Sequence, residues 1–316
     1  MFSPMVLAFA LGIIASRLKS DLKFPDSLYT ALTIYLMAAI GFKGGYKLSI
    51  TPLAEVYLPV LMAIVLSCSI PLWTFWIMRK IGKFNIYDAA ALAAHYGSVS
   101  VVTFSAALAF QDSLNIKYEG FMPSLLAIME VPAILVAIGL SRIYQSGIQS
   151  SSIPLKQIFR ELIVGKSSVL LVGFLIIGYI SGQHGWEQVS PLFDLPFKGV
   201  LTLFLLEAGL VAGRKLADLK QRVGFIILFG ILMPVFHAAL GIYLGMLAGL
   251  SESGAMILGV LAASASYIAA PAACRVALPE ANPSYYLTAS LAVTFPFNIT
   301  LGLPLYHHIA TIIYKF

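Results

Sequence analysis

Charged residues are scarce in this sequence. Asp, Glu, Lys and Arg make up only 11% of the 316 residues, whereas soluble domains average about 25%. Apolar residues supply 59% of the chain and the mean hydropathy is +0.91, which excludes an ordinary water-soluble domain. The composition therefore predicts an all-α, polytopic membrane protein.

Cysteine is also rare. Cys68 and Cys274 stand alone, which excludes a disulfide framework and a Cys-rich zinc site. The sequence has no H-E-x-x-H, Walker A, G-x-S-x-G or dinucleotide-binding motif. We therefore expect no enzyme, no resident metal and no cofactor, with a sodium ion left open as a coupling ion.

Apolar stretches fill most of the chain and divide into ten spans, since a helix needs about 20 residues to cross a bilayer. The predicted spans are 4–18, 27–44, 55–78, 86–110, 119–143, 166–182, 196–213, 223–249, 253–278 and 284–312. No basic region precedes the first stretch and no cleavage site follows it. We interpret it as a span and not as a signal peptide.

Basic residues divide unevenly between the two sides of these spans. With residues 145–165 in the cytoplasm, the opposite side holds few of the 20 lysines and arginines: Lys43, Lys47, Lys117, Lys198 and Lys315. This asymmetry follows the positive-inside rule and predicts that both termini lie outside the cytoplasm. The net charge of +6 reflects topology, so we expect membrane lipid and no nucleic acid as a partner.

Two pairs of segments resemble each other. GFKGGYKL (41–48) and GLVAGRKL (209–216) share the pattern G-x-x-x-G-x-K-L, and GSVSVVT (97–103) aligns with ASASYIA (263–269). Each unit would hold five spans, an odd number, so the second copy would cross the membrane in the opposite orientation. We predict inverted repeats at 1–144 and 166–316. A polar cytoplasmic linker at 145–165, too short for a docking domain, would join them.

Polar residues interrupt the fourth and ninth spans near their middle. Such backbone is tolerated in a membrane where it lines a cavity or is buried in protein, and broken helices of the two repeats meet at the substrate site of many transporters. The N-termini of half-helices favour an anion, and Gly97 would permit the first break. The alternative is that these small residues serve close helix packing. The predicted substrate-binding residues are Gly97, Ser98, Val99, Ser100, Ser264, Ala265, Ser266 and Tyr267.

Several strings resemble the sodium-dependent bicarbonate transporters of the SbtA type over nearly the whole chain. They are GSVSVVTFSAALA, EVPAILVAI, ASASYIAAPA and PEANPSYYLTAS, with Gly41, Gly44, Gly45, Pro234 and His237. The resemblance implies import of bicarbonate with sodium across a bacterial cytoplasmic membrane by a homotrimer. It also implies elevator-like movement of a core (spans 3–5 and 8–10) against a scaffold (spans 1, 2, 6 and 7). A PII-like regulatory protein would bind the cytoplasmic face.

The chain departs from the family at the second break, where Ala265, Tyr267 and Ala269 replace two serines and an aspartate. At the first break Val101 and Val102 replace a glycine and a serine. The residues that remain for cation binding or coupling are Thr103, Glu130 and Asn298. Sodium coupling, proton-coupled uptake of another small carboxylate, and a non-transporting sensor with the same fold all stay open.

A few ionisable groups stand inside predicted spans. Glu130 points to function because a charge in a membrane is costly, although a structural role beside Pro132 is the alternative. His95 can reach the first break or simply pack against its neighbours. We expect Glu207 and His237 to be structural, and the adjacent histidines His307 and His308 to lie at the membrane interface.

Overall fold

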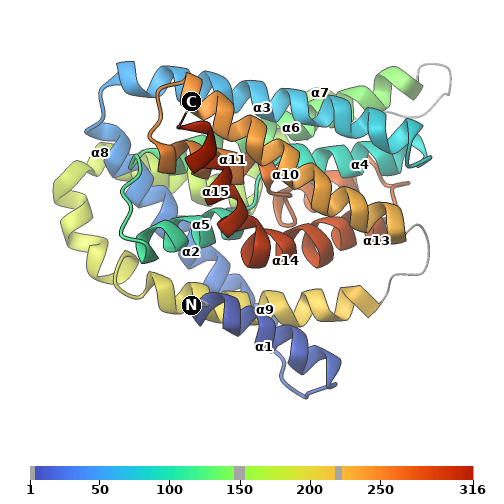
Figure 1. The fold of residues 1–316 in the computed structure, drawn as a ribbon, viewed down its shortest axis with the longest axis horizontal. Coiled ribbons are helices and arrows are strands. Elements are labelled where there is room, and N and C mark those ends of the chain that lie inside the picture. Colours follow the sequence, from blue (N-terminus) through green and yellow to red (C-terminus); the bar gives the residue numbers. More distant parts are fainter. Residues whose placement is uncertain (1–3, 146–153, 218–222, 316) are drawn as a thin grey trace.

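The computed structural model describes residues 4–145, 154–217 and 223–315, and the regular structure of these residues is entirely helical (Figure 1). The helices that coincide with unbroken predicted spans are α1 (Pro4–Arg17), α2 (Asp26–Ser49), α3 (Leu53–Lys80), α6 (Met122–Gln145), α8 (Lys166–Phe193), α9 (Phe197–Ala217) and α10 (Val223–Leu247). The predicted end of the sixth span coincides with a bend of α8 at Gly182, which has a φ of 58°. Only glycine adopts that backbone conformation without strain.

The fourth and ninth predicted spans are each two half-helices. The first break separates α4 (Ile86–Gly97) from α5 (Val101–Ser113), and the second separates α11 (Glu252–Ala263) from α12 (Ala269–Ala277). Both breaks fall at the polar residues that interrupt the apolar pattern. The apolar window of the first broken span is 94% buried, against 17% for α8, so the broken span lies inside the bundle and α8 at its edge.

The last predicted span is irregular. It consists of α13 (Pro283–Leu287), the π-helical segment η1 (Thr288–Thr294), α14 (Phe295–Phe297), the π-helical segment η2 (Asn298–Gly302) and α15 (Leu303–Ile313). Proline lacks an amide hydrogen and disturbs the i→i+4 ladder, and Pro296 and Pro304 stand at the starts of α14 and α15. Wide π-helical turns are frequent at functional sites.

The predicted linker contains a helix that the sequence analysis did not assign. This helix, α7 (Leu155–Val164), buries Ile158 and Leu162 and packs against α6, α8 and α12. The two buried residues are four positions apart, on one face of the helix. The rest of the linker, 146–153, lies outside the described residues.

The outer surface of the bundle is apolar, as a bilayer requires. Large apolar side chains that are about half exposed occur on many helices, including Leu11, Leu61, Ile176, Leu228 and Leu301. Six segments of the described chain are long and apolar enough to cross a membrane: Leu53–Lys80, Ile86–Ser113, Met122–Tyr144, Lys166–Phe193, Gly224–Leu247 and Pro283–Ile313. The fold is consistent with a multi-pass membrane protein.

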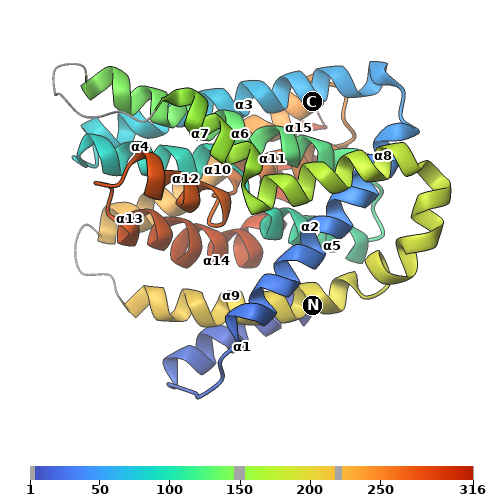
Figure 2. The same ribbon diagram turned by 180° about the vertical axis from the view of Figure 1, so that it is seen from behind.

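The helices pack in two sets. One set pairs α1 with α9 and α2 with α8, and α1 and α9 lie together at one side of the molecule (Figure 1). Figure 2 shows α2 crossing this side diagonally. In the other set α3 packs on α4 and α6, and α10 packs on α11 and α15. Glycine allows the closest approach: a Cβ added to Gly45 would overlap the carbonyl oxygen of Leu175 on α8.

Candidate functional site

The two helix breaks cross each other and are joined by two hydrogen bonds that backbone amides donate. The amide of Ser100 donates to the hydroxyl of Ser264 at 3.0 Å, and the amide of Ser266 donates to the carbonyl oxygen of His95 at 2.8 Å. All four residues are buried. Each bond ties one broken helix to the other, so the crossing is a defined structure.

Serine hydroxyls stabilise the ends of the half-helices at the crossing. The hydroxyl of Ser100 accepts the amide hydrogen of Thr103 at 3.2 Å and caps α5. The hydroxyl of Ser266 accepts the amide hydrogen of Ala270 at 3.2 Å, in the first turn of α12. The extended backbone of Ser98 and Ser264 ends α4 and α11. These contacts satisfy some, but not all, of the backbone groups that a helix end leaves free.

The amide groups at the crossing that have no hydrogen-bond partner among the described residues include five at the N-termini of α5 and α12. Two belong to the first turn of α5, at Val101 and Val102, and three precede or begin α12, at Tyr267, Ile268 and Ala269. Val101 and Val102 are buried, whereas Tyr267, Ile268 and Ala269 are half-buried. Buried amides are nearly always paired, so the unpaired amides of Val101 and Val102 need an explanation. Free amides at a helix N-terminus, where the helix dipole is positive, form a site for an anion.

Tyr267 belongs to the second break, and its hydroxyl lies near Ser100 of the first break. Its hydroxyl is buried and interacts with the side chain of Ser100, without a hydrogen bond of ordinary geometry among the described residues. Its ring lies 5.2 Å from the ring of Phe295, edge to face. The second break thus carries a phenol hydroxyl, which is a neutral donor.

The apolar residues of the crossing contribute packing. Val99 and Ala265 are buried in the extended segments. Gly97 ends α4 with an ordinary backbone, and a Cβ there would overlap the ring of Pro71 on α3. Glycine is therefore required at this position for the close approach of α3, and not for an unusual φ.

A second polar contact lies beside the first break. The hydroxyl of Ser98 donates to the carbonyl oxygen of Glu130 at 3.0 Å, and the Glu130 carboxylate accepts from the hydroxyl of Ser167 at 2.8 Å. Glu130 is buried on α6 and Ser167 is buried at the start of α8. The backbone of Glu130 thus contacts the first break, and its carboxyl group is oriented by a residue from another helix.

Asn298 supports the second break from the last span. Its side-chain amide donates to the carbonyl oxygen of Ala263 at 3.0 Å, and its side-chain oxygen accepts from the hydroxyl of Tyr306 at 2.6 Å. Asn298 and Tyr306 are fully buried. Thr103, the third residue predicted for coupling, is buried in the first turn of α5.

The sequence model of the Na⁺-dependent bicarbonate transporter superfamily matches residues 4–311. The chain belongs to this superfamily. The search of curated proteins gave no significant match.

Membership of the Na⁺-dependent bicarbonate transporter superfamily makes the chain a member of a transporter family and not of an enzyme family. The described residues hold no group of three or more His, Cys, Asp or Glu side chains that could bind a metal ion. Among these residues a sodium ion would therefore depend largely on hydroxyl and carbonyl oxygens. Hydroxyl, carbonyl and carboxylate oxygens suit a hard cation.

The histidines of this superfamily member differ in their surroundings. His95 donates from Nδ1 to the carbonyl oxygen of Ala91 and stacks on Tyr286, with ring centroids 4.4 Å apart; its Nε2 has no partner among the described residues. His237 accepts from the indole of Trp73 at 2.9 Å and joins α10 to α3. The second contact fits the structural role expected for His237.

The remaining ionisable residues lie away from the crossing or at the rim. Glu207 is buried on α9. Its carboxylate lies 3.4 Å from a guanidinium nitrogen of Arg214, which stands about two turns further along the same helix. His308 is exposed and His307 half-buried near the end of α15. None of these three predicted residues hydrogen-bonds to a residue of either break within the described chain.

Sequence reasoning missed two residues that support the site. Ser167 binds the Glu130 carboxylate, and Tyr306 binds Asn298. Ser167 stands just inside a predicted span, where a polar residue needs a partner, and this was an available signal. Tyr306 gave no signal, because its partner lies two turns back along a helix with irregular turns.

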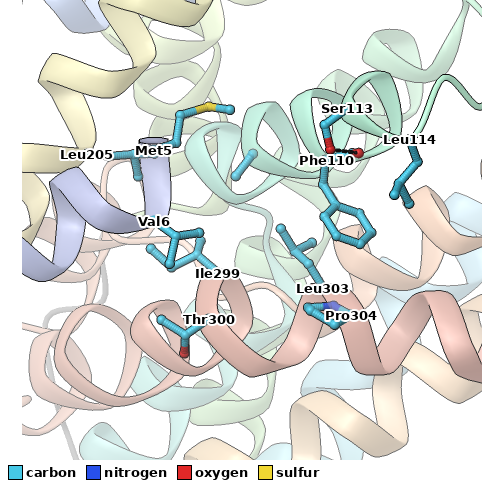
Figure 3. A pocket seen from close by; sticks show the side chains of 11 residues that line it. Met5, Val6, Phe110, Ser113, Leu114, Leu205, Ile299, Thr300, Leu303 and Pro304 are labelled. Carbon is cyan, nitrogen blue, oxygen red and sulfur yellow. Dashed lines mark hydrogen bonds between the residues drawn. The ribbon is translucent and has the colours of Figure 1, made fainter. Parts of the chain in front are cut away.

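A cavity of about 310 Å³ lies between α1, α5, α9 and the last span (Figure 3). Met5, Phe110, Leu205 and Ile299 point into it, and its lining is mainly apolar. An apolar lining does not suit an anion, because a charge would lose its hydration there without compensation. The polar crossing, and not this cavity, is therefore the candidate substrate site.

Proposed function

We propose that this chain is a secondary active transporter that imports a small anion, bicarbonate with sodium in the first place. The observation that carries the proposal is the set of five unpaired amides at the N-termini of α5 and α12. Their partial positive charge would replace the hydration of an anion in an enclosed site. The substrate-binding residues are Ser98, Ser100, Ser264, Ser266 and Tyr267, with Gly97, Val99 and Ala265 shaping the site.

Bicarbonate fits this set of donors. It carries one negative charge and accepts hydrogen bonds at its oxygens, while its hydroxyl group can donate to a serine oxygen or a backbone carbonyl. The buried hydroxyl of Tyr267 adds a donor between the two half-helices. A carboxylate at this position would repel the anion, so tyrosine favours anion binding over direct cation binding.

The driving ion would bind next to the anion and not within the amide cradle. Glu130, Thr103 and Asn298 are the coupling residues of the proposal, and Glu130 is the acid among them. Its carboxyl group lies one hydrogen bond from Ser167 and its carbonyl oxygen one from Ser98. The crossing itself offers no acidic side chain to a cation. The second candidate function is therefore proton-coupled uptake of another small carboxylate substrate, with the proton carried by Glu130.

Two reciprocal contacts support the inverted repeat within this proposal. Asp88 at the start of α4 accepts the amide hydrogen of Asn282, which caps α13, at 2.7 Å. Glu119, just before α6, accepts the amide hydrogen of Ser251, which caps α11, at 2.6 Å. In each case the broken helix of one half is tied to the last span of the other half.

The pairing of α1 with α9 and of α2 with α8 supports a ten-span arrangement in the same way, since the first two spans of each half exchange partners. These four helices would form the scaffold, and α3–α6 with α10–α15 the core that moves in an elevator-like cycle. Homotrimer formation and binding of a PII-like regulator at the cytoplasmic face complete the proposal by family resemblance.

Uptake of labelled bicarbonate into proteoliposomes tests the proposal, with an inward sodium gradient, an inward proton gradient or neither. We expect saturable uptake that the sodium gradient accelerates. Ser266→Ala removes the acceptor of the Ala270 amide in α12 and should lower uptake, whereas Ser290→Ala removes a hydroxyl that bonds to the carbonyl oxygens of Tyr286 and Leu287 within the last span. Absence of uptake under all three conditions refutes bicarbonate, and binding without flux would identify a sensor.

A further inference from the structure

Most of the lysines predicted to face outward gather in one cleft. Lys43, Lys47 and Lys117 line a hollow of about 650 Å³, and Lys43 and Lys198 line a smaller hollow that adjoins it. The lining comes from α2, the end of α5, the segment before α6 and the start of α9. Of the five lysines predicted on that side, only Lys315 lies elsewhere.

The cleft carries a surplus of positive charge. Asp194 pairs with Lys43 at 2.7 Å and Asp112 pairs with Lys198 at 3.6 Å. No carboxylate of the described residues lies within ion-pair distance of Lys47 or Lys117. Two cations of the cleft therefore remain without a counter-charge.

The other titratable groups at the cleft do not cancel this charge. Tyr118 donates its hydroxyl hydrogen to Asp112 at 3.1 Å. Burial raises the pKa of Tyr118 above its ordinary value, and the nearby Asp112 and Asp194 raise it further, so the phenol stays neutral. Glu119 is bound to the amide and hydroxyl of Ser251 on the other side of its segment.

The repeated motif GFKGGYKL places two of these lysines. Gly41 and Gly45 let α2 approach α8, and Gly44 does the same against Pro123 at the start of α6, where a Cβ would lie 2.5 Å from the proline Cβ. Lys43 and Lys47 project between these contacts into the cleft. The motif thus has a charge-positioning role beyond close packing.

Lys47 is held in place although it has no acidic partner. Its aliphatic chain lies against Gly120, where an added Cβ would come within 2.7 Å of the Lys47 Cγ. Its ammonium lies 4.9 Å from the centroid of the Tyr46 ring. These contacts order the side chain, so its charge acts from a fixed position in the cleft.

The cleft is connected to the candidate substrate site by one half-helix. Leu108, Ala109 and Asp112 of α5 line the cleft, and the first turn of α5 holds two of the unpaired amides at the crossing. These cleft residues stand seven to eleven positions beyond Val101 on the helix, so the cleft lies about 10–17 Å from the crossing. A ligand leaving the cleft toward the crossing would move along α5 at the boundary of the two helix sets.

We infer that this cleft is an outer vestibule that concentrates small oxyanions, through Lys47 and Lys117, before they reach the crossing. The identity of the anion as the transported substrate rests on the proposed function. A cleft with a net charge raises the local concentration of the opposite ion and its association rate, and salt screens the effect. The membrane-topology rule disfavours lysines on the outer side, so their clustering calls for such a role.

The charge of the cleft can be measured without transport. Ile116 lines the hollow beside Lys47 and can be changed to Cys in a Cys68→Ala background, since Cys274 is buried. We expect the ratio of its reaction rates with an anionic and a cationic methanethiosulfonate to fall roughly tenfold in Lys47→Gln/Lys117→Gln. The matched control Lys315→Gln should leave the ratio unchanged. An unchanged ratio in the double variant overturns the vestibule.

Transport kinetics then test the link to the substrate. At low ionic strength Lys47→Gln/Lys117→Gln should raise the KM for external bicarbonate by roughly three- to tenfold with little change in Vmax. Added salt should raise the wild-type KM toward that of the variant. If the wild type takes up no bicarbonate but the rate ratio still falls, the proposed function fails and the vestibule stands for another anion. If the wild type and the double variant both take up bicarbonate with the same KM, the vestibule has no role in uptake.

Discussion

The hydroxyl of Ser264 accepts the amide hydrogen of Ser100 at 3.0 Å, and this contact joins the C-terminal end of α11 to the N-terminal end of α5. Ser264→Ala would leave a buried amide without an acceptor. We expect a loss of about 1–3 kcal/mol of stability and reduced uptake. Ser105→Ala, a control on α5 whose hydroxyl bonds only to Val101, should cost less. Thermal unfolding in detergent measures both effects. Equal unfolding temperatures of Ser264→Ala and Ser105→Ala would contradict a stabilising role of the contact between Ser100 and Ser264.

Asn298 makes two buried hydrogen bonds, and a pair of variants separates them. Asn298→Ala leaves the carbonyl oxygen of Ala263 and the hydroxyl of Tyr306 without this partner, at a cost of about 2–4 kcal/mol. Tyr306→Phe removes only the second bond and should cost about half as much. The double variant should be less destabilised than the sum, because the two residues share one contact. Additive changes in unfolding temperature would show that they act separately.

The sequence was sufficient to predict where the helices break. A run of small and polar residues inside an apolar stretch marks Ser98–Ser100 and Ser264–Ser266, and both segments have extended backbone in the structure. The signal is strong because an exposed backbone in a membrane must be explained by burial or a cavity. Glu130 and Asn298 were predicted as coupling residues from the sequence, and the structure adds their hydrogen-bond partners.

The irregular last span and helix α7 were not predicted. Pro296 and Pro304 indicated a disturbed helix, but the number of residues per turn depends on packing against neighbouring helices, which a single sequence does not encode locally. In α7 the apolar pair Ile158 and Leu162 has helical spacing, but the sequence analysis treated 145–165 only as a short polar linker. The partner of that apolar face, α12, is far away in the sequence.

Glu130 provides a test of the coupling ion. Glu130→Gln keeps an acceptor for the hydroxyl of Ser167 but removes the charge and the exchangeable proton. We expect bound or transported anion to persist while acceleration by the sodium or proton gradient is lost. Ser167→Ala is the control, because it removes the hydrogen bond and keeps the carboxyl group, and its uptake should still respond to the gradient. A Glu130→Gln variant that responds as strongly as the wild type would contradict the assignment of this residue.

Close packing of α2 on α8 provides a test of the scaffold. A Cβ on Gly45 would overlap the carbonyl oxygen of Leu175, whereas a Cβ on Gly173 of α8 would meet no atom within 4 Å. Gly45→Ala should therefore destabilise the protein by about 1–3 kcal/mol, because the backbones of α2 and α8 must move apart. Gly173→Ala should stabilise it by about 0.5–1 kcal/mol through higher helix propensity. Thermal unfolding and the yield of folded protein check both signs, and a stabilising Gly45→Ala would contradict the contact between these helices.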